Sequence, residues 1–193
     1  MVRVFLIIFS IVLLTSCVTN DVVDEGGNKS SITESQNAVG KNGPKFENYD
    51  GTPLKIAVVG DEPKIKENEL ITFTQINFGD LQDINSNDYD AVFIMKEFLK
   101  KATESKYAEL YKTTNLPFFF IQSEKLTYAF TNEDSSYEKA RRLSNLEYAV
   151  GYYSKEDGHL GWKYGLYNDQ ESQKNILDVF SRIFKTIEEL NYQ

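Results

Sequence analysis

Short apolar runs separated by polar stretches dominate the chain from residue 54 onward. Four of these runs are typical of buried strands, because they are short, apolar and bounded by Gly, Pro or acidic residues. The second run alternates apolar and polar residues, whereas the other three are continuous and fit strands buried on both faces. The predicted strands cover residues 54–60, 71–76, 91–95 and 118–122.

The links between these runs decide how the strands pair. The link from the first strand to the second is short for a parallel crossover, which normally needs about a dozen residues. A one-turn helix over 64–68 would allow a parallel pair, and an antiparallel pair is the alternative. Residues 97–113 carry apolar side chains at helical spacing, namely Leu99, Ala102, Tyr107 and Leu110. This predicted helix, set between two strands, favours a right-handed parallel crossover.

The pattern is less regular after residue 122. Tyr128 and Phe130 fit either a loop or a strand, and residues 137–143 predict a short helix. Segments 147–153 and 161–167 are rich in aromatic residues and flank a turn with Gly158, which predicts a β-hairpin.

The chain closes with the strongest predicted helix. Asn168 is its predicted N-cap, and Glu171 is the capping-box partner three residues on. One apolar stripe follows, made by Ile176, Leu177, Phe180, Ile183, Phe184, Ile187 and Leu190. Such a stripe usually packs on a sheet.

Together these elements predict an α/β fold with a small open sheet in a flavodoxin-like or Rossmann-like arrangement, a C-terminal aromatic hairpin and a terminal helix. The first three strands also resemble the sheet of response-regulator receiver domains. In that family a phosphoacceptor Asp ends the third strand. Met95 stands at the corresponding place here, so the resemblance supplies no phosphoacceptor.

The N-terminus has the layout of a secretory signal peptide. Arg3 precedes an apolar run over 4–14, of about 11 residues or roughly 16 Å of helix, which is short for a hydrocarbon layer of roughly 30 Å. The following motif, Leu14-Thr15-Ser16-Cys17, resembles the lipobox of bacterial lipoproteins. The resemblance implies cleavage before Cys17, lipidation of its thiol, and an anchor in the cell membrane on the extracytoplasmic side. The alternative is an ordinary signal peptide, or a short uncleaved anchor, with an incidental cysteine.

Three parts follow for the whole chain: a signal peptide over 1–16, a lipidated Cys17 with a disordered tether up to residue 50, and a single α/β globular domain over 51–193. The tether is polar and has no sustained period, so it buries too little apolar surface to offset its ordering entropy. A flexible coil of about 30 residues reaches roughly 30 Å. Docking of 22–23 or 46–49 on the domain is the alternative.

The charge balance limits the partners. Removing the signal peptide removes Arg3 and no acid, so the formal charge changes from −8 to −9. Nucleic acid and an anionic lipid surface repel an acidic domain, so we expect neither as a partner. The expected contacts are the membrane, through the lipid anchor, and an unknown ligand or protein of the cell envelope.

Polar residues gather where the predicted strands end. Because the carboxyl ends of parallel strands meet at one edge of an open sheet, we predict a ligand-binding rim there. The alternative is that strand ends are polar because they meet water. The rim residues are Asp61 and Glu62 after the first strand, Lys96 and Glu97 after the third, and Gln122, Ser123 and Glu124 after the fourth.

Other chemistry has little support in the sequence. Residues 83–87 match the first three ligand positions of an EF-hand, but Asp88 replaces the turn Gly and Ile94 the final Glu, so a solvated loop is predicted. His159, the only histidine, lies in a predicted turn and favours an exposed loop residue. With one His and Cys17 as the only thiol, we expect no catalytic residue, metal or cofactor.

The predicted hairpin concentrates aromatic side chains. Alternate residues of a strand face opposite sides, so one set would fill the core and the other would offer an aromatic surface for peptides or sugars. The alternative is that both faces are covered. The set comprises Tyr148, Tyr152, Tyr153, Trp162, Tyr164 and Tyr167.

The functional hypothesis is a membrane-anchored lipoprotein whose domain binds a ligand or partner without catalysis. The alternative is a hydrolase of envelope glycan or another polymer that uses a pair of carboxylates, a role for which Asp and Glu are abundant. A purely structural part in an envelope complex is a third hypothesis.

Overall fold

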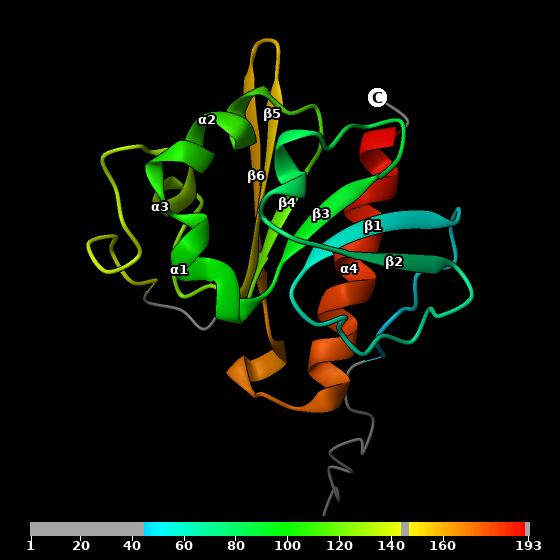
Figure 1. The fold of residues 1–193 in the computed structure, drawn as a ribbon. Helices are drawn as coiled ribbons and strands as arrows, with labels where there is room; N and C mark the ends of the chain where they lie inside the picture. Colours follow the sequence, from blue (N-terminus) through cyan, green and yellow to red (C-terminus); the bar gives the residue numbers. More distant parts are fainter. Residues whose placement is uncertain (1–44, 144–146, 192–193) are drawn as a thin grey trace, which may run out of the picture. The chain divides into compact units, whose positions relative to one another are not determined.

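A six-stranded mixed sheet forms the centre of the structure, a computed structural model that describes residues 45–143 and 147–191 (Figure 1). The strand order is β2-β1-β3-β4-β5-β6; the first four strands are parallel, and β5 and β6 join antiparallel. This confirms the predicted small open α/β sheet. The strands are β1 (Leu54–Val59), β2 (Ile71–Ile76), β3 (Ala91–Ile94), β4 (Phe118–Ile121), β5 (Glu147–Lys155) and β6 (Gly158–Gly165).

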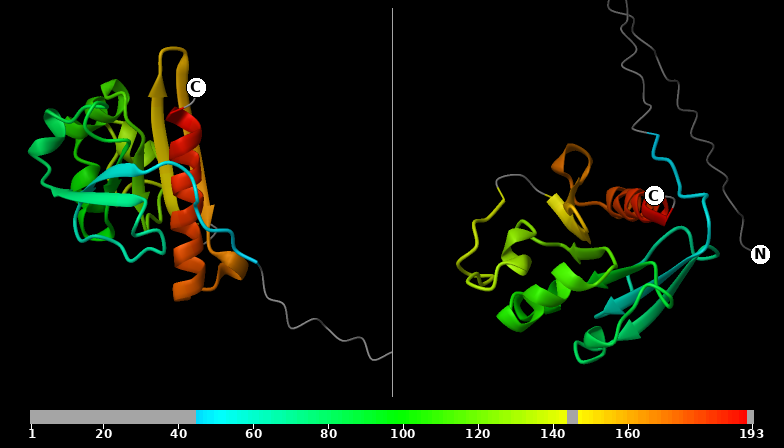
Figure 2. Two further views of the ribbon diagram at one scale, coloured as in Figure 1. Left: turned by 90° about the vertical axis from the view of Figure 1, so that its right-hand side faces the viewer. Right: turned by 90° about the horizontal axis from the view of Figure 1, so that it is seen from above.

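Helices cover both faces of the sheet. α1 (Leu99–Ala102), α2 (Ser105–Thr113) and α3 (Tyr128–Thr131) lie on one face, and the long α4 (Gln173–Asn191) lies on the other (Figure 2). Short 3-10 turns occur at η1 (Asp80–Gln82), η2 (Lys96–Phe98) and η3 (Tyr167–Asp169). No helix in this described part of the chain combines the length and the apolar character needed to cross a bilayer.

The predicted signal peptide, the lipobox and most of the tether fall within residues 1–44, outside the described residues.

Two hydrophobic cores explain why the strand runs are continuously apolar. In β1, Ala57 and Val59 face the core under α1–α3, whereas Ile56 and Val58 face the core under α4. In β4 the two sides of the strand carry adjacent phenylalanines. Phe120 stacks on Phe130 of α3 with ring centroids 3.7 Å apart, and Phe119 belongs to the core under α4. A strand buried on both faces has no polar position to alternate with.

The sequence left open whether the first two strands pair in parallel or antiparallel. The two strands are parallel, with Leu54 opposite Ile71, and the link between them contains no helix. Ile65 and Leu70 of this link pack against the core under α4. The link therefore crosses on the same face as α4 and covers it with loop in place of a helix.

The predicted helix over 97–113 is broken into η2, α1 and α2. The break lies at Thr103 and Glu104, where Glu104 has an extended backbone with ψ of 133°. The hydroxyl of Thr103 donates to the carbonyl of Lys100 at 2.8 Å and accepts the amide of Tyr137 at 3.0 Å. This local bonding competes with the helix ladder at a residue type prone to it.

The segment after β4 also differs from the expectation. Residues 128–131 form α3, where the sequence left a loop or a strand open, and the predicted helix over 137–143 is wrong. The backbone of that stretch bonds to other segments: the carbonyl of Ala140 accepts Lys125 Nζ at 2.6 Å, and the amide of Leu143 donates to the carbonyl of Glu124 at 2.9 Å.

The aromatic hairpin is confirmed as β5 and β6, and the stripe of α4 packs on the sheet as predicted. The predicted N-cap is wrong. Asn168 lies in η3 with φ of 51°, and α4 begins after Ser172, whose hydroxyl accepts the amide of Asn175 at 3.3 Å. Ser172 thus takes the capping role that a Ser commonly fills.

Residues 45–50, placed in the tether by the sequence, pack on the domain. Tyr49 is 2% exposed and belongs to the core under α4. Its amide donates to Glu67 Oε1 at 3.1 Å, and the same oxygen accepts the hydroxyl of Ser181 in α4 at 2.6 Å. We call these three residues, Tyr49, Glu67 and Ser181, the Glu67 clasp. The docking alternative for 46–49 is therefore observed, and residues 22–23 lie outside the described residues.

Candidate functional site

The carboxyl ends of β1, β3 and β4 meet at one edge of the sheet, as the rim hypothesis requires, and there Asp61 and Glu97 come together. Glu97 Oε1 accepts the amide of Asp61 at 3.3 Å. Gly60 makes this approach possible: its φ is 118°, and a Cβ on it would lie 2.5 Å from Glu97 Oε1. The Glu97 carboxylate therefore caps the end of β1.

The other predicted rim residues do not join this pair. Ser123 is buried, and its hydroxyl donates to the carbonyl of Lys125 at 2.8 Å while accepting the amide of the same residue at 3.1 Å. Glu124 is exposed and pairs with Arg142, whose Nε lies 2.7 Å from its Oε2. Ser123 and Glu124 therefore make local contacts within residues 123–142. Glu62 and Lys96 are exposed at the surface.

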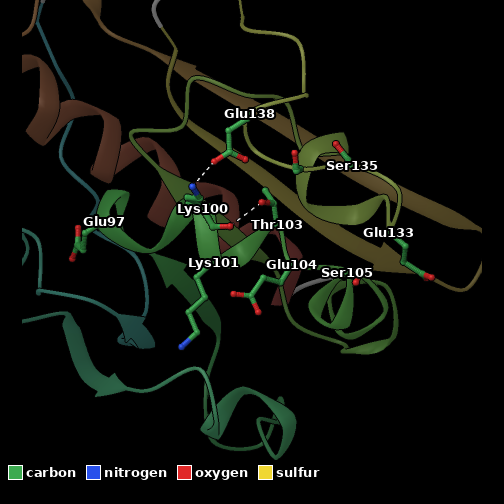
Figure 3. A pocket seen from close by; sticks show the side chains of 10 residues that line it. Glu97, Lys100, Lys101, Thr103, Glu104, Ser105, Glu133, Ser135 and Glu138 are labelled. Carbon is green, nitrogen blue, oxygen red and sulfur yellow. Dashed lines mark hydrogen bonds and ion pairs between the residues drawn. The ribbon is translucent and has the colours of Figure 1, made fainter.

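A charged cavity of about 590 Å³ lies beside Glu97 on the face of α1 and α2 (Figure 3). Its side chains point in different directions, and Glu97 and Glu133 lie on opposite sides of it. Lys100 Nζ pairs with Glu138 Oε1 at 2.7 Å, and Lys112 Nζ lies 3.4 Å from Glu133 Oε1. Exposed pairs of this kind contribute little to stability. The cavity is a solvated surface on which several of the carboxylates pair with lysines.

Within the described ranges, no group of three or more His, Cys, Asp or Glu residues is placed to hold a metal ion. The EF-hand-like stretch is an exposed loop whose polar side chains bond to each other, with Asn85 Nδ2 donating to Asp88 Oδ2 at 2.8 Å. His159 is exposed at the start of β6, where its ring stacks on Tyr152 at 5.4 Å.

A second cavity of about 590 Å³, with more apolar residue types in its lining, opens at the same edge of the sheet, between the β1–β2 link, the end of β3 and the N-terminal half of α4. We call it the rim cleft. A volume of this size lies within the range of about 300–1,000 Å³ common for small-molecule sites. Its walls are Pro63, Lys64, Met95, Tyr148, Glu171, Ser172, Gln173, Ile176, Leu177 and Phe180.

The rim cleft exists because the β1–β2 link has no helix. Ile176 and Leu177 belong to the apolar stripe of α4, yet they remain partly exposed, whereas Val179, Ile183 and Ile187 are fully covered. The loop of the link leaves these two side chains partly uncovered, and they form one wall of the cleft.

The lining of the rim cleft divides into two parts. Met95, Ile176, Leu177 and Phe180 give an apolar floor, and Lys64, Glu171, Ser172 and Gln173 give polar groups near its mouth. Tyr148 joins the two, since its ring packs edge-on against Phe180 with centroids 6.2 Å apart. Burial, with a smaller effect from the negative charge of Glu171, raises the pKa of Tyr148 to about 12. Its phenol therefore stays protonated at neutral pH and can donate a hydrogen bond.

The sequence predicts a ligand-binding rim at this edge of the sheet, but it does not predict this cleft. Lys64 was assigned to a possible helical turn, and Ile176 and Leu177 to a stripe that packs on the sheet. The available signal was the combination of a link too short for a crossover helix with a stripe that extends to Ile176.

The aromatic hairpin is mostly covered, as the alternative for that cluster proposes. Tyr152 and Tyr164 are about 6% and 5% exposed, and Trp162 stacks on Phe119 at 6.1 Å. The hydroxyl of Tyr153 donates to Asn115 Oδ1 at 2.7 Å. Tyr148, Tyr153 and Trp162 are partly exposed, and Tyr167, just after β6, is the most exposed member of the cluster at 45%.

Comparison with models of protein families finds no match for this chain, and neither curated proteins nor solved structures give one.

Proposed function

We propose that the protein is an extracytoplasmic lipoprotein, anchored in the cell membrane through Cys17, whose α/β domain binds a small ligand in the rim cleft without catalysis. The observation that carries the binding role is the rim cleft itself. It joins an apolar floor to a few polar groups at the edge of a parallel sheet, where ligands of open α/β folds bind.

The lining specifies the kind of ligand. An alkyl or other apolar group fits against Met95, Ile176 and Phe180, and each methylene buried there contributes about 0.8 kcal/mol. A polar group of the same ligand meets the ammonium of Lys64 and the phenol of Tyr148. The ligand is therefore an amphiphile of modest size.

Thermal unfolding of the mature chain tests this role. Octyl glucoside, below its micellar concentration, serves as the first probe, followed by sugars, peptides and metabolites. A ligand at 100 times its dissociation constant stabilises the fold by about 2.7 kcal/mol, which is visible as a higher melting temperature. We expect Ile176→Gln, which puts an amide on the apolar floor, to abolish the shift.

The matched control is Leu190→Gln, a partly exposed leucine at the far end of the same helix. It should retain the shift. Equal shifts in both variants, or no binding of any probe, would remove the rim cleft as a ligand site.

The anchor has its own test. Metabolic labelling with palmitate and fractionation of cells should find label and protein in the membrane, whereas Cys17→Ser should carry no label and leave the membrane fraction. Unchanged fractionation of Cys17→Ser would favour an ordinary signal peptide or an uncleaved anchor.

One observation keeps the hydrolase as a second candidate: the Glu97 carboxylate accepts the backbone amide of Asp61, which makes these two acidic residues neighbours at the end of β1. Two carboxylates within roughly 10 Å of each other are what glycoside hydrolysis requires. Turnover of an envelope glycan that disappears in both Asp61→Asn and Glu97→Gln would replace the binding function with this one.

A further inference from the structure

A second cleft, of about 690 Å³, lies beside the rim cleft where residues 45–48 pack on α4. Among the described residues that line it there are three lysines, Lys45, Lys66 and Lys174, and no Asp or Glu. This runs against the composition of the chain, which has 29 acidic and 21 basic residues. We call it the lysine cleft.

Two of these ammonium groups contact other lining residues of the cleft. Lys66 Nζ donates to Asn48 Oδ1 at 2.9 Å, and Lys174 Nζ lies 5.1 Å from the centroid of the Phe46 ring. The Phe46 ring in turn packs edge-on against Tyr167, with centroids 5.9 Å apart. The docked segment thus carries part of the site and orients the rest.

Two acids that neighbour lining residues of the cleft, Glu47 and Glu67, are engaged by other groups. Glu47 Oε2 accepts Lys185 Nζ at 3.0 Å, outside the cleft. Glu67 is buried in its clasp, where its two oxygens accept the amides of Tyr49 and Lys66 and the hydroxyl of Ser181. The Glu67 carboxylate keeps its charge in the clasp and opposes an anion in the cleft, whereas the three lysines line the cleft itself and act on an anion at shorter range.

The two clefts share a wall. Gln173 and Leu177, one helical turn apart on α4, line both of them. A ligand that lies across the first turns of α4 can place an apolar group in the rim cleft and an anionic group among the lysines.

We propose that the lysine cleft binds the phosphate group of an amphiphile whose apolar part occupies the rim cleft. This rests on the proposed function and narrows its ligand to a phosphate-bearing amphiphile. A phosphate suits the site because its several acceptor oxygens and double charge can engage three compact ammonium groups at once. The same chemistry is offered by the headgroup of an anionic phospholipid and by a free phosphorylated amphiphile.

The net charge of the protein does not exclude the phospholipid. The repulsion expected from the sequence applies to the molecule at a distance, whereas three lysines act locally. In addition, the chain that precedes Lys45 leads to Cys17, so the proposed anchor would hold this cleft within reach of the membrane.

Calorimetry with two probes of equal chain length tests the proposal, using the full mature chain with Cys17→Ser so that no attached lipid competes. Octyl phosphate should bind at least tenfold more tightly than octyl glucoside. Inorganic phosphate should compete with the former only, and the preference should weaken as salt rises. The triple variant Lys45→Gln, Lys66→Gln, Lys174→Gln should lose the preference and keep its affinity for octyl glucoside.

A control variant carries the same change of charge at three exposed positions elsewhere, Lys55→Gln, Lys139→Gln and Lys155→Gln. It should keep the preference for octyl phosphate. Circular dichroism and thermal unfolding verify that both triple variants are folded.

The outcomes separate the two proposals. Equal affinities for both probes, with octyl glucoside binding lost in Ile176→Gln, would overturn the phosphate site and leave the proposed function standing. A preference that survives in the cleft triple variant would also overturn it. If neither octyl phosphate nor octyl glucoside binds, both the proposed function and this inference are wrong.

Vesicles then distinguish the two sources. Lysine-dependent sedimentation with phosphatidylglycerol vesicles, and not with phosphatidylcholine vesicles, supports a headgroup as the ligand. Binding of monomeric octyl phosphate without binding to either vesicle supports a free phosphorylated amphiphile.

Discussion

Replacing Glu67 with alanine should destabilise the domain, because this buried carboxylate accepts hydrogen bonds from separate parts of the chain. Glu67 is a buried carboxylate that joins three parts of the chain: the docked segment through Tyr49, its own link through Lys66, and α4 through Ser181. In Glu67→Ala the donors from all three parts lose their acceptor.

The magnitude follows from the burial of those donors. The bonds from the amide of Tyr49 and the hydroxyl of Ser181 are buried, at 3.1 and 2.6 Å, and that from the amide of Lys66 is partly buried at 3.2 Å. The hydroxyl of Ser181 keeps a second acceptor, the carbonyl of Leu177 at 3.1 Å, so the amide of Tyr49 is the buried donor that the change affects most. Loss of its acceptor costs roughly 1–3 kcal/mol, and relief of the desolvated charge of Glu67 offsets part of this while the weaker bonds of Lys66 and Ser181 add to it, so we expect a loss of about 2 kcal/mol.

Urea unfolding of the mature chain with Cys17→Ser measures this loss directly. In a domain of about 150 residues it corresponds to a fall of roughly 4–8 °C in melting temperature. Glu69→Ala is the matched control, because Glu69 is an exposed glutamate of the same link, and it should change stability by no more than about 0.5 kcal/mol. If both variants unfolded at the same urea concentration, the clasp would have no role in stability.

Two further predictions concern β5. Gly151→Ala should destabilise by about 1–3 kcal/mol, because its Cβ would lie 2.9 Å from the Trp162 ring; the urea midpoint should fall and the tryptophan emission shift, whereas Gly161→Ala, whose Cβ meets its nearest atom at 3.8 Å, should leave both unchanged. Tyr148 should ionise near pH 12 because burial raises its pKa, and Tyr148→Phe should remove that component from an ultraviolet titration; in Glu171→Gln it should ionise at lower pH, since a negative charge that opposes ionisation is gone.

The sheet could be predicted from the sequence because its signal is local. A run such as 118–121 is apolar throughout, and a strand buried on both faces leaves no other arrangement for so many adjacent aromatic side chains. The connection between β1 and β2 could not be decided in this way. Both the parallel and the antiparallel pair satisfy the local pattern, and the choice depends on Ile65 and Leu70 packing on the face that α4 also covers.

Helix ends depended on contacts that are distant in the sequence. Thr103 breaks the predicted helix partly because its hydroxyl accepts the amide of Tyr137, thirty-four residues away. Asn168 and Ser172 are both common N-cap residues, and the left-handed backbone at Asn168 turns the chain before the helix begins. Asn and Ser have nearly equal preferences for the N-cap position, so the sequence alone does not tell which of the two caps the helix.

The candidate site illustrates the same limit. The polar rim residues were visible as a class, yet only Asp61 and Glu97 lie together, because Glu124 pairs with Arg142 instead. The rim cleft depends on what the β1–β2 link leaves uncovered, and the lysine cleft on a segment that its polar composition assigned to the tether. No local sequence pattern predicts that part of a helix stays uncovered or that a polar segment docks on the domain.

The docked segment connects stability to the proposed binding. It supplies Lys45, Phe46 and Asn48 to the lysine cleft, and the Glu67 clasp holds it through Tyr49. At a temperature where Glu67→Ala remains folded, the variant should therefore bind octyl phosphate more weakly, while its affinity for octyl glucoside stays the same. The sign of the effect is diagnostic: loss of a negative charge near the lysines would by itself strengthen phosphate binding, so a weakening reports release of the segment. Calorimetry on Glu67→Ala that found tighter binding of octyl phosphate would show that the segment stays in place without the clasp.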